Sequence, residues 1–158
     1  MGPPAPTGAC CSELAAPAAA GYAAARLVKT APRVLLVLAS VLLAASGIIH
    51  AVAFRKALLV LAEAHLPRFY ENSLKGLWLA DSTTLIGVAV ILALVAARPA
   101  SATRPVVVLL AMIPAATAVL VYVFVGAFFA PHLLLGISAL IVIAGLQFPD
   151  RWPADGAR

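Results

Sequence analysis

The sequence predicts an all-α integral membrane protein: a transmembrane four-helix bundle of up-down-up-down topology that follows a disordered N-terminal tail. Composition is the first observation behind this prediction. Of the 158 residues, 64% are hydrophobic and only 11% are charged, and the mean hydropathy is +1.07. A soluble domain carries about 25% charged and about 45–50% apolar residues, and a small soluble core cannot hide so large an apolar surplus. A water-soluble enzyme is therefore excluded, and so is a wholly disordered chain, which needs low hydrophobicity.

Residues 1–32 form a segment rich in alanine and proline. Prolines recur as far as Pro17, and a helix interior does not tolerate them, so we expect a disordered cytoplasmic tail here. Residues 18–29 leave a second interpretation open, a short helix on the membrane surface. The adjacent Cys10 and Cys11 have no other cysteine to pair with, which fits a reducing compartment.

Four apolar runs, each long enough to cross a bilayer, are the second observation. They cover residues 34–54, 76–97, 105–129 and 132–148, within a predicted membrane domain of residues 33–149. At about 1.5 Å per residue, about 20 helical residues cross a hydrocarbon core of about 30 Å. The runs lack the alternation of membrane β-strands, and helices satisfy their own backbone hydrogen bonds in lipid. The fourth run is short, which predicts either an upright helix or one whose first turn includes Ala130-Pro131.

Residues 55–75 form the one long connection between runs. Its apolar first part, residues 57–66, is predicted to be a helical extension of the first span or a short helix on the outer surface, ending at Pro67. The other connections, 98–104 and the turn at 130–132, are short. Short connections place successive helices side by side and antiparallel. Residues 150–158 are expected to be a short cytoplasmic tail.

Lys and Arg at the ends of the runs predict the orientation, because cytoplasmic loops carry an excess of these residues. With the N-terminus inside, the cytoplasmic side holds Arg26, Lys29, Arg33, Arg98, Arg104, Arg151 and Arg158. The outer side then holds Arg55, Lys56, Arg68 and Lys75. The excess of Lys and Arg on this side predicts that both termini face the cytoplasm. Separately, the alanine-rich composition is consistent with a high-GC bacterial genome. We therefore expect a multi-pass protein of the bacterial inner (plasma) membrane.

His50 and Asp81 are the ionisable residues of the first and second runs. Each lies about 6 to 8 Å below the outer end of its run, at about 1.5 Å per residue. If the two runs are antiparallel neighbours, His50 and Asp81 lie at matching depth. An ionisable side chain in hydrocarbon is costly and normally faces the bundle interior, so the two side chains can meet there. Three alternatives stay open: a structural pair, a functional pair that binds a proton, a headgroup or a small ligand, and two residues that never meet.

Trp78, Thr84 and Tyr122 complete the candidate polar site. Trp78 and Thr84 flank Asp81 at three-residue spacing and share its helix face, and Tyr122 reaches a similar outer depth from the third run. Each also has a simpler interpretation: Trp78 as an aromatic anchor at the interface, Tyr122 as a core aromatic, and Thr84 as a hydroxyl bonded to its own helix. Polarity inside the runs is thus predicted to gather in the outer half of the bundle.

No arrangement of residues typical of a catalytic site is found, so we predict no catalytic residues, no cofactor and no metal. A bis-histidine haem between His50 and His132 is geometrically conceivable, but it is not our prediction. The net charge of +5 comes from the ends of the apolar runs and not from a basic face, so no nucleic-acid partner is expected. The expected partners are membrane lipids, with a homo-oligomer or a larger membrane complex left open.

The favoured function is therefore a non-catalytic accessory component, or one that binds lipids or small apolar molecules at its outer polar patch. The alternative is a proton-coupled small-molecule transporter in which Asp81 takes up and releases the proton and a homo-oligomer forms the path.

The stretch from His50 to Gly87, in which Lys75-Gly76-Leu77-Trp78-Leu79-Ala80-Asp81-Ser82 enters the second span, resembles the small uncharacterised four-helix membrane proteins of bacteria. The layout of spans is also similar to that of the DoxX-like group. The resemblance implies an architecture of four membrane helices and no particular mechanism.

Overall fold

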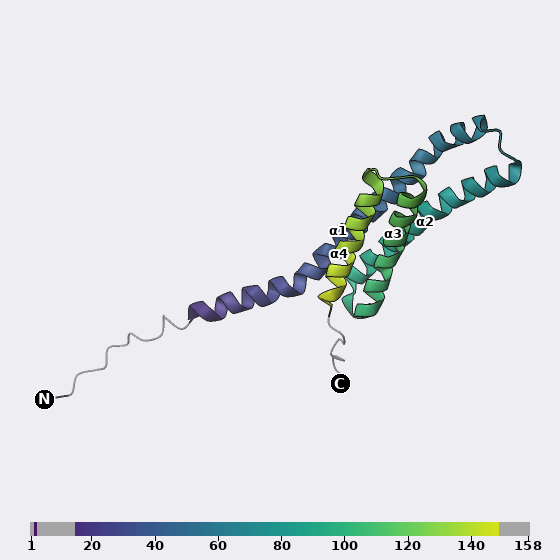
Figure 1. Ribbon diagram of the computed structural model, residues 1–158. Helices are drawn as coiled ribbons and strands as arrows, with labels where there is room; N and C mark the ends of the chain where they lie inside the picture. The colour runs from purple at the N-terminus through teal and green to yellow at the C-terminus, as the bar shows by residue number, and fades with distance from the viewer. Residues whose placement is uncertain (1, 3–14, 149–158) are drawn as a thin grey trace. The chain divides into compact units, whose positions relative to one another are not determined.

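The computed structural model describes Gly2 and residues 15–148, and these residues form helices joined by short links, with no strand among them (Figure 1). The elements are α1 (Ala15–Glu63), α2 (Arg68–Ala97), the short 3-10 helix η1 (Pro99–Ser101), α3 (Arg104–Phe124) and α4 (Phe129–Leu146). The chain divides into two units, Met1–Ala31 and Pro32–Arg158, which are described separately.

The first unit differs from the predicted disordered tail, because its residues 15–31 belong to helix α1. Alanine has the highest helix propensity, and residues 15–25 are mostly alanine. Pro17 falls in the first turn of α1, where a missing N–H costs no hydrogen bond. Residue 1 and residues 3–14 of the predicted tail, which include Cys10 and Cys11, lie outside the described residues, as does the C-terminal segment 149–158.

Four helices are long and apolar enough to cross a membrane: Thr30–Glu63, Arg68–Ala97, Arg104–Phe124 and Phe129–Leu146. They contain 34, 30, 21 and 18 residues. At about 1.5 Å per residue the last two match a hydrocarbon core of about 30 Å, whereas the first two are about 45 to 50 Å long. The first two helices therefore have length to spare beyond a single crossing.

The ends of the helices differ from the ends of the apolar runs. Helix α1 continues to Glu63 and thus includes the predicted helical extension, and α2 begins at Arg68, well before Gly76. Helix α3 ends at Phe124 and not at Phe129, because Gly126 adopts a positive φ of 105° and its N–H bonds to the carbonyl of Val121. The predicted turn at 130–132 instead forms the first turn of α4.

Helices α1 and α2 form an antiparallel hairpin. The hydroxyl of Ser40 on α1 donates to the carbonyl of Ala89 on α2 (2.8 Å). Further along, Gly47 lies so close to α2 that a Cβ there would sit 2.8 Å from Cγ1 of Ile86 and 3.1 Å from the carbonyl oxygen of Ser82. Along the hairpin, the residue numbers of the contacting positions rise on α1 and fall on α2, so the two helices run antiparallel.

Helices α3 and α4 form a second antiparallel hairpin. The buried hydroxyl of Ser138 on α4 donates to the carbonyl of Ala111 on α3 (3.0 Å). Gly145 lies against Val108 of α3, whose Cγ2 would be 2.9 Å from an added Cβ. Such small residues allow helix backbones to approach closely, which is a common way of packing helices in membranes.

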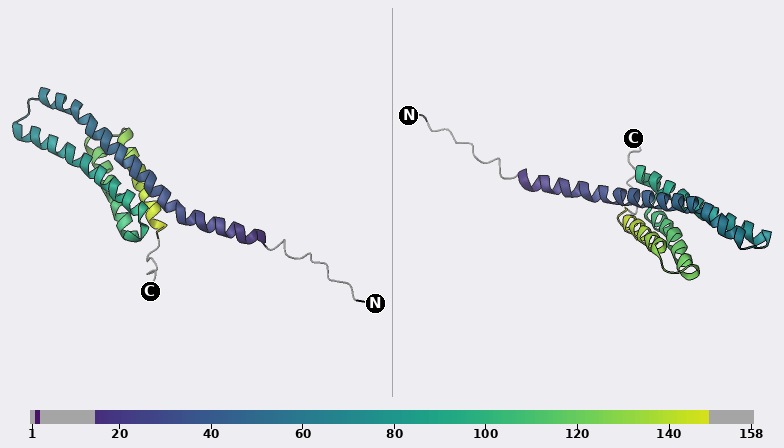
Figure 2. Two further views of the ribbon diagram at one scale, coloured as in Figure 1. Left: turned by 180° about the vertical axis from the view of Figure 1, so that it is seen from behind. Right: turned by 90° about the horizontal axis from the view of Figure 1, so that it is seen from above.

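The core of the second unit is apolar and ends part of the way along the first hairpin. Its members include Leu36 and Leu43 of α1, Leu92 of α2, and Ile137 and Ile141 of α4. The buried residue of α1 nearest the hairpin tip is Gly47, and α2 contributes buried residues only from Ser82 onward, so residues 48–81 contain none. Figures 1 and 2 show this end of the α1–α2 hairpin continuing past the turn between α3 and α4.

Candidate functional site

The close approach at Gly47 positions the candidate site. Because α1 and α2 nearly touch at Gly47 and Ser82, the next turn of each helix brings its side chains face to face. His50 follows Gly47 by three positions, and Trp78 precedes Ser82 by four, so both return to the same helix face. The site therefore lies just beyond Gly47 and Ser82, the last buried residues of α1 and α2 on the side of the hairpin tip.

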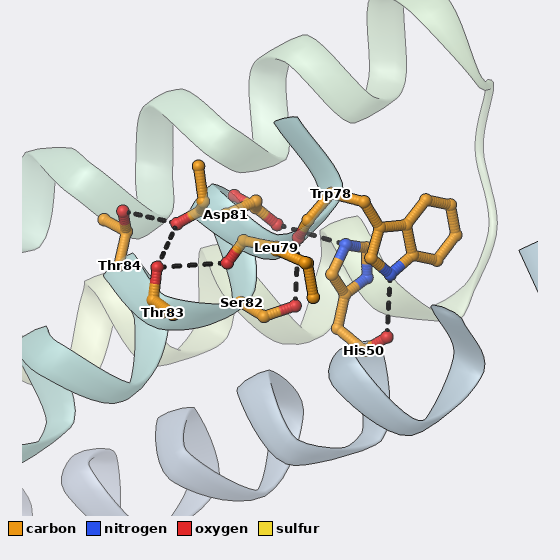
Figure 3. Close-up of polar contacts among 8 residues, drawn as sticks. His50, Trp78, Leu79, Asp81, Ser82, Thr83 and Thr84 are labelled. Atoms are coloured by element: carbon orange, nitrogen blue, oxygen red, sulfur yellow. Dashed lines mark hydrogen bonds and ion pairs between the residues drawn. The ribbon is translucent and has the colours of Figure 1, made fainter. Parts of the chain in front are cut away.

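His50, Trp78 and Asp81 form one polar cluster (Figure 3). Nε2 of His50 lies 3.5 Å from Oδ2 of Asp81. The indole N–H of Trp78 donates to the backbone carbonyl of His50 (2.8 Å). The imidazole also stacks on the indole, with ring centroids 4.4 Å apart and 7° between the planes. The structure thus brings His50 and Asp81 together. It also shows two contacts between Trp78 and His50, the hydrogen bond and the ring stack, that the sequence did not indicate.

Both members of the ion pair are partly open to their surroundings. The side chains of His50 and Asp81 are each 34% exposed. The 3.5 Å between Nε2 and Oδ2 is longer than the roughly 2.7–2.9 Å of a strong charge-assisted hydrogen bond. The pair is therefore neither sealed in the core nor tightly bonded, and a further polar group can approach it.

Thr84 does not join the polar cluster through its hydroxyl. Its Oγ1 donates to the carbonyl of Ala80 in its own helix (2.8 Å). The neighbouring Ser82 likewise donates to the carbonyl of Trp78 (3.0 Å). Hydroxyls bonded to their own helix need no further partner in an apolar surrounding, which agrees with the simpler interpretation of Thr84.

Tyr122 contacts His132 and not the polar cluster. The two rings meet edge to face, with centroids 5.3 Å apart and 76° between the planes. His132 is exposed, and its Nδ1 donates to the carbonyl of Phe128 (2.6 Å). This second aromatic pair belongs to the α3–α4 turn. The predicted site of five residues is therefore divided between a three-residue cluster, a separate aromatic pair and a threonine bonded to its own helix.

An apolar groove borders the polar cluster on the side of the hairpin tip. It has a volume of about 380 Å³ and is lined by Ala57, Val60 and Leu61 of α1 and by Leu74 and Trp78 of α2. Trp78 belongs to both features, because the ring that lines the groove also stacks on His50. The sequence did not indicate this groove, although its α1 residues recur at three- and four-residue spacing, as residues of one helix face do.

Charged residues lie near the groove in the sequence of both helices. Arg55 and Lys56, which precede Ala57 in the chain, are exposed and form no ion pair with any residue that the structure describes. On α2, the ammonium of Lys75 pairs with the carboxylate of Glu71, and both side chains are about one-third exposed. Glu and Lys at four-residue spacing form such pairs on a helix surface, so the positive charge of Lys75 is already compensated.

A metal site is not formed by the part of the chain that the structure describes, where no three His, Cys, Asp or Glu side chains gather. Within the polar cluster, Nε2 of His50, Oδ2 of Asp81 and Nε1 of Trp78 have partners in the protein. The arrangement is suited to recognising a polar group beside an apolar chain, because a charge pair and an apolar groove meet at one indole.

Comparison with protein-family models, with curated proteins and with solved structures finds no match for this chain.

Proposed function

We propose that this protein is a non-catalytic membrane component that binds an amphiphile, a lipid or a small apolar molecule with a polar head, at the polar cluster. The observation that carries the proposal is the position of Trp78 between a partly exposed His50–Asp81 pair and an apolar groove. A polar head would meet the charge pair while the apolar part lies against the indole and the groove. Binding sites for small molecules commonly combine an apolar lining with a few polar groups that fix orientation.

The proposal includes an arrangement in the membrane. Four helices cross the bilayer of a bacterial inner membrane in up-down-up-down order, with both termini in the cytoplasm. The antiparallel pairs α1–α2 and α3–α4 and the short link through η1 support this order. The polar cluster then lies towards the outer leaflet, and the free end of the α1–α2 hairpin lies in the outer headgroup layer. The similarity of layout to the DoxX-like group stays a prediction.

Native mass spectrometry of the protein purified in a mild detergent tests this function. We expect the wild-type protein to retain an amphiphile as a discrete mass adduct, and Asp81→Asn to lose most of it. Thr84→Val is the matched control, because the Thr84 hydroxyl is bonded to its own helix; this variant should retain the adduct. Equal retention by the wild type and Asp81→Asn, or an adduct-free wild type, would reject the proposal.

A flux measurement separates this function from the transporter alternative. Reconstituted in liposomes with a pH gradient across the membrane, a non-catalytic component should give no proton-coupled uptake of small solutes. An uptake that Asp81→Asn abolishes would replace the proposal by a transporter in which this carboxylate carries the proton.

A further inference from the structure

One acceptor atom of the polar cluster is left without a partner. Oδ2 of Asp81 faces Nε2 of His50 (Figure 3), whereas Oδ1 of Asp81 has no hydrogen-bond or ion-pair partner among the residues that the structure describes. An ionised carboxylate only accepts hydrogen bonds, and this side chain is about one-third exposed. A group that approaches Oδ1 from outside must therefore donate a hydrogen bond to it.

The charge of the polar cluster excludes an anionic head. The carboxylate of Asp81 carries one negative charge, and the imidazole of His50 carries either no charge or one positive charge, so the pair is negative or neutral and never positive. An anionic head would be repelled by the carboxylate with no net positive charge to offset the repulsion. An ammonium can donate to Oδ1 in both charge states of the imidazole.

The charges beside the groove do not reverse this selection. Lys56 lies four residues before Val60, a groove residue, and Glu63 lies three residues after it, so opposite charges flank the same face of α1. Neither forms an ion pair with a residue that the structure describes. Arg55 lies on the face of α1 opposite the groove residues, and the charge pair on α2 is already compensated. The charge that selects the head is therefore that of Asp81.

Trp78 also favours a cation over an uncharged head. Its indole lines the groove and stacks on His50. Asp81 follows Trp78 by three residues on the same helix face, so a head that bonds to Asp81 lies next to the indole. An ammonium is attracted to the face of an indole, whereas a hydroxyl lacks this attraction.

We propose that the amphiphile is a single-chain amine whose ammonium donates to Oδ1 of Asp81 and whose apolar chain lies in the groove. This inference rests on the proposed function and names the class of amphiphile. The groove begins at Trp78, beside the polar cluster, and continues along α1 to Leu61. From His50 to Leu61 the helix rises about 16 Å, at about 1.5 Å per residue, so the occupant needs an extended apolar chain.

The direction of the groove selects a single-chain amine over a phospholipid of the bilayer. The groove lies between the polar cluster and the hairpin tip, so an amphiphile whose head is at Asp81 directs its chain towards the tip. With the tip in the outer headgroup layer, as proposed above, this direction is opposite to that of the acyl chains of the outer leaflet. The groove supplies apolar surroundings at a depth where the bilayer has headgroups, which only a chain in this reversed direction needs.

Native mass spectrometry with defined probes tests this inference. Dodecylamine, dodecanol and dodecanoate are added separately, at equal concentration, to the full chain purified in a mild detergent. We expect dodecylamine to be retained at least about fivefold more than dodecanol, because an ammonium adds the attraction of its charge to the hydrogen bond, and dodecanoate to be retained least. Phosphatidylethanolamine carries the same primary amine on a phospholipid, and we expect it to be retained no better than dodecanol.

Three variants assign the preference to the residues named. Asp81→Asn should remove the preference for the amine over the alcohol. Glu63→Gln is the matched control, because it removes the same charge from an exposed position beside the groove; this variant should keep the preference. Ala57→Phe, which fills the groove, should weaken retention of both dodecylamine and dodecanol.

Several outcomes would overturn the inference. They are equal retention of dodecylamine and dodecanol, stronger retention of dodecanoate or phosphatidylethanolamine than of dodecylamine, and a preference that survives Asp81→Asn or is lost in Glu63→Gln. If the wild type nevertheless carries an adduct that depends on Asp81, the proposed function stands and only the class of amphiphile is wrong. A wild type that retains neither an adduct nor any probe would reject both.

Discussion

The imidazole of His50 lies flat against the indole of Trp78, with 4.4 Å between the ring centroids, while the indole N–H donates to the backbone carbonyl of the same histidine. The indole of Trp78 therefore contacts both the side chain and the main chain of His50. The contact joins α1 to α2 at the first level beyond the buried core. It also fixes the ring of His50 in the plane from which Nε2 meets Asp81.

This stack predicts that the fluorescence of Trp78 is quenched. An imidazole in contact with an excited indole can accept an electron from it and quench its emission. In the Trp152→Phe protein, where Trp78 is the remaining tryptophan, emission should therefore be low and should increase when the imidazole of residue 50 is removed. Steady-state fluorescence in detergent measures the effect.

His50→Gln is the variant that tests the assignment of this quenching. It removes the imidazole but keeps the backbone carbonyl that accepts the indole N–H, so emission should increase. His132→Gln is the matched control, because His132 contacts Tyr122 and not Trp78, and its emission should equal that of the parent protein. Equal emission from His50→Gln and the parent protein would contradict the stacked arrangement.

The length of each apolar run predicted the four candidate membrane helices. The positions of His50 and Asp81 within their runs predicted that the two residues lie at matching depth, where they can meet. The ends of α1 and α2 were predicted less well, because charged residues such as Lys56 and Lys75 mark where an apolar run stops and not where a helix stops. The contact of Trp78 with His50, and the groove, depend on how the two helices are rotated about their axes. That rotation is set by the close approach at Gly47, which a count of apolar residues does not reveal.

The ion pair between His50 and Asp81 is expected to contribute little to stability in detergent. Nε2 of His50 and Oδ2 of Asp81 lie 3.5 Å apart, which is longer than the roughly 2.7–2.9 Å of a strong charge-assisted hydrogen bond. Asp81→Asn keeps the shape and a hydrogen-bonding group, so its melting temperature should stay close to that of the wild type. Asp81→Leu leaves His50 without a polar partner and should melt lower. Thermal unfolding followed by circular dichroism compares them; identical melting of all three proteins, together with unchanged amphiphile binding, would show that the pairing has no role.

Two glycines of the first hairpin form a matched test of the helix contact. A Cβ at Gly47 would lie 2.8 Å from Ile86 and 3.1 Å from a backbone oxygen of α2, whereas a Cβ at Gly87 meets no atom within 4 Å. Gly47→Ala should therefore destabilise the protein by about 1–3 kcal/mol, the usual cost of overpacking. Gly87→Ala should be neutral or stabilise by up to about 1 kcal/mol, because alanine favours a helix. Unfolding in detergent measures both, and equal effects of the two substitutions would contradict the close approach of α1 to α2.

The orientation with both termini inside predicts which surface positions a membrane-impermeant thiol reagent reaches. In a protein with Cys10→Ser and Cys11→Ser, a single cysteine is introduced either as Asn72→Cys near the hairpin tip or as Ser101→Cys in η1; both native residues are exposed. Because basic residues are in excess on the side of the termini and η1, that side should be cytoplasmic. A membrane-impermeant maleimide applied to intact cells should then label Asn72→Cys at once and Ser101→Cys only after the membrane is permeabilised. The reverse pattern would place the polar cluster and the groove towards the cytoplasmic leaflet, and the proposed amphiphile would have to be sought on that side.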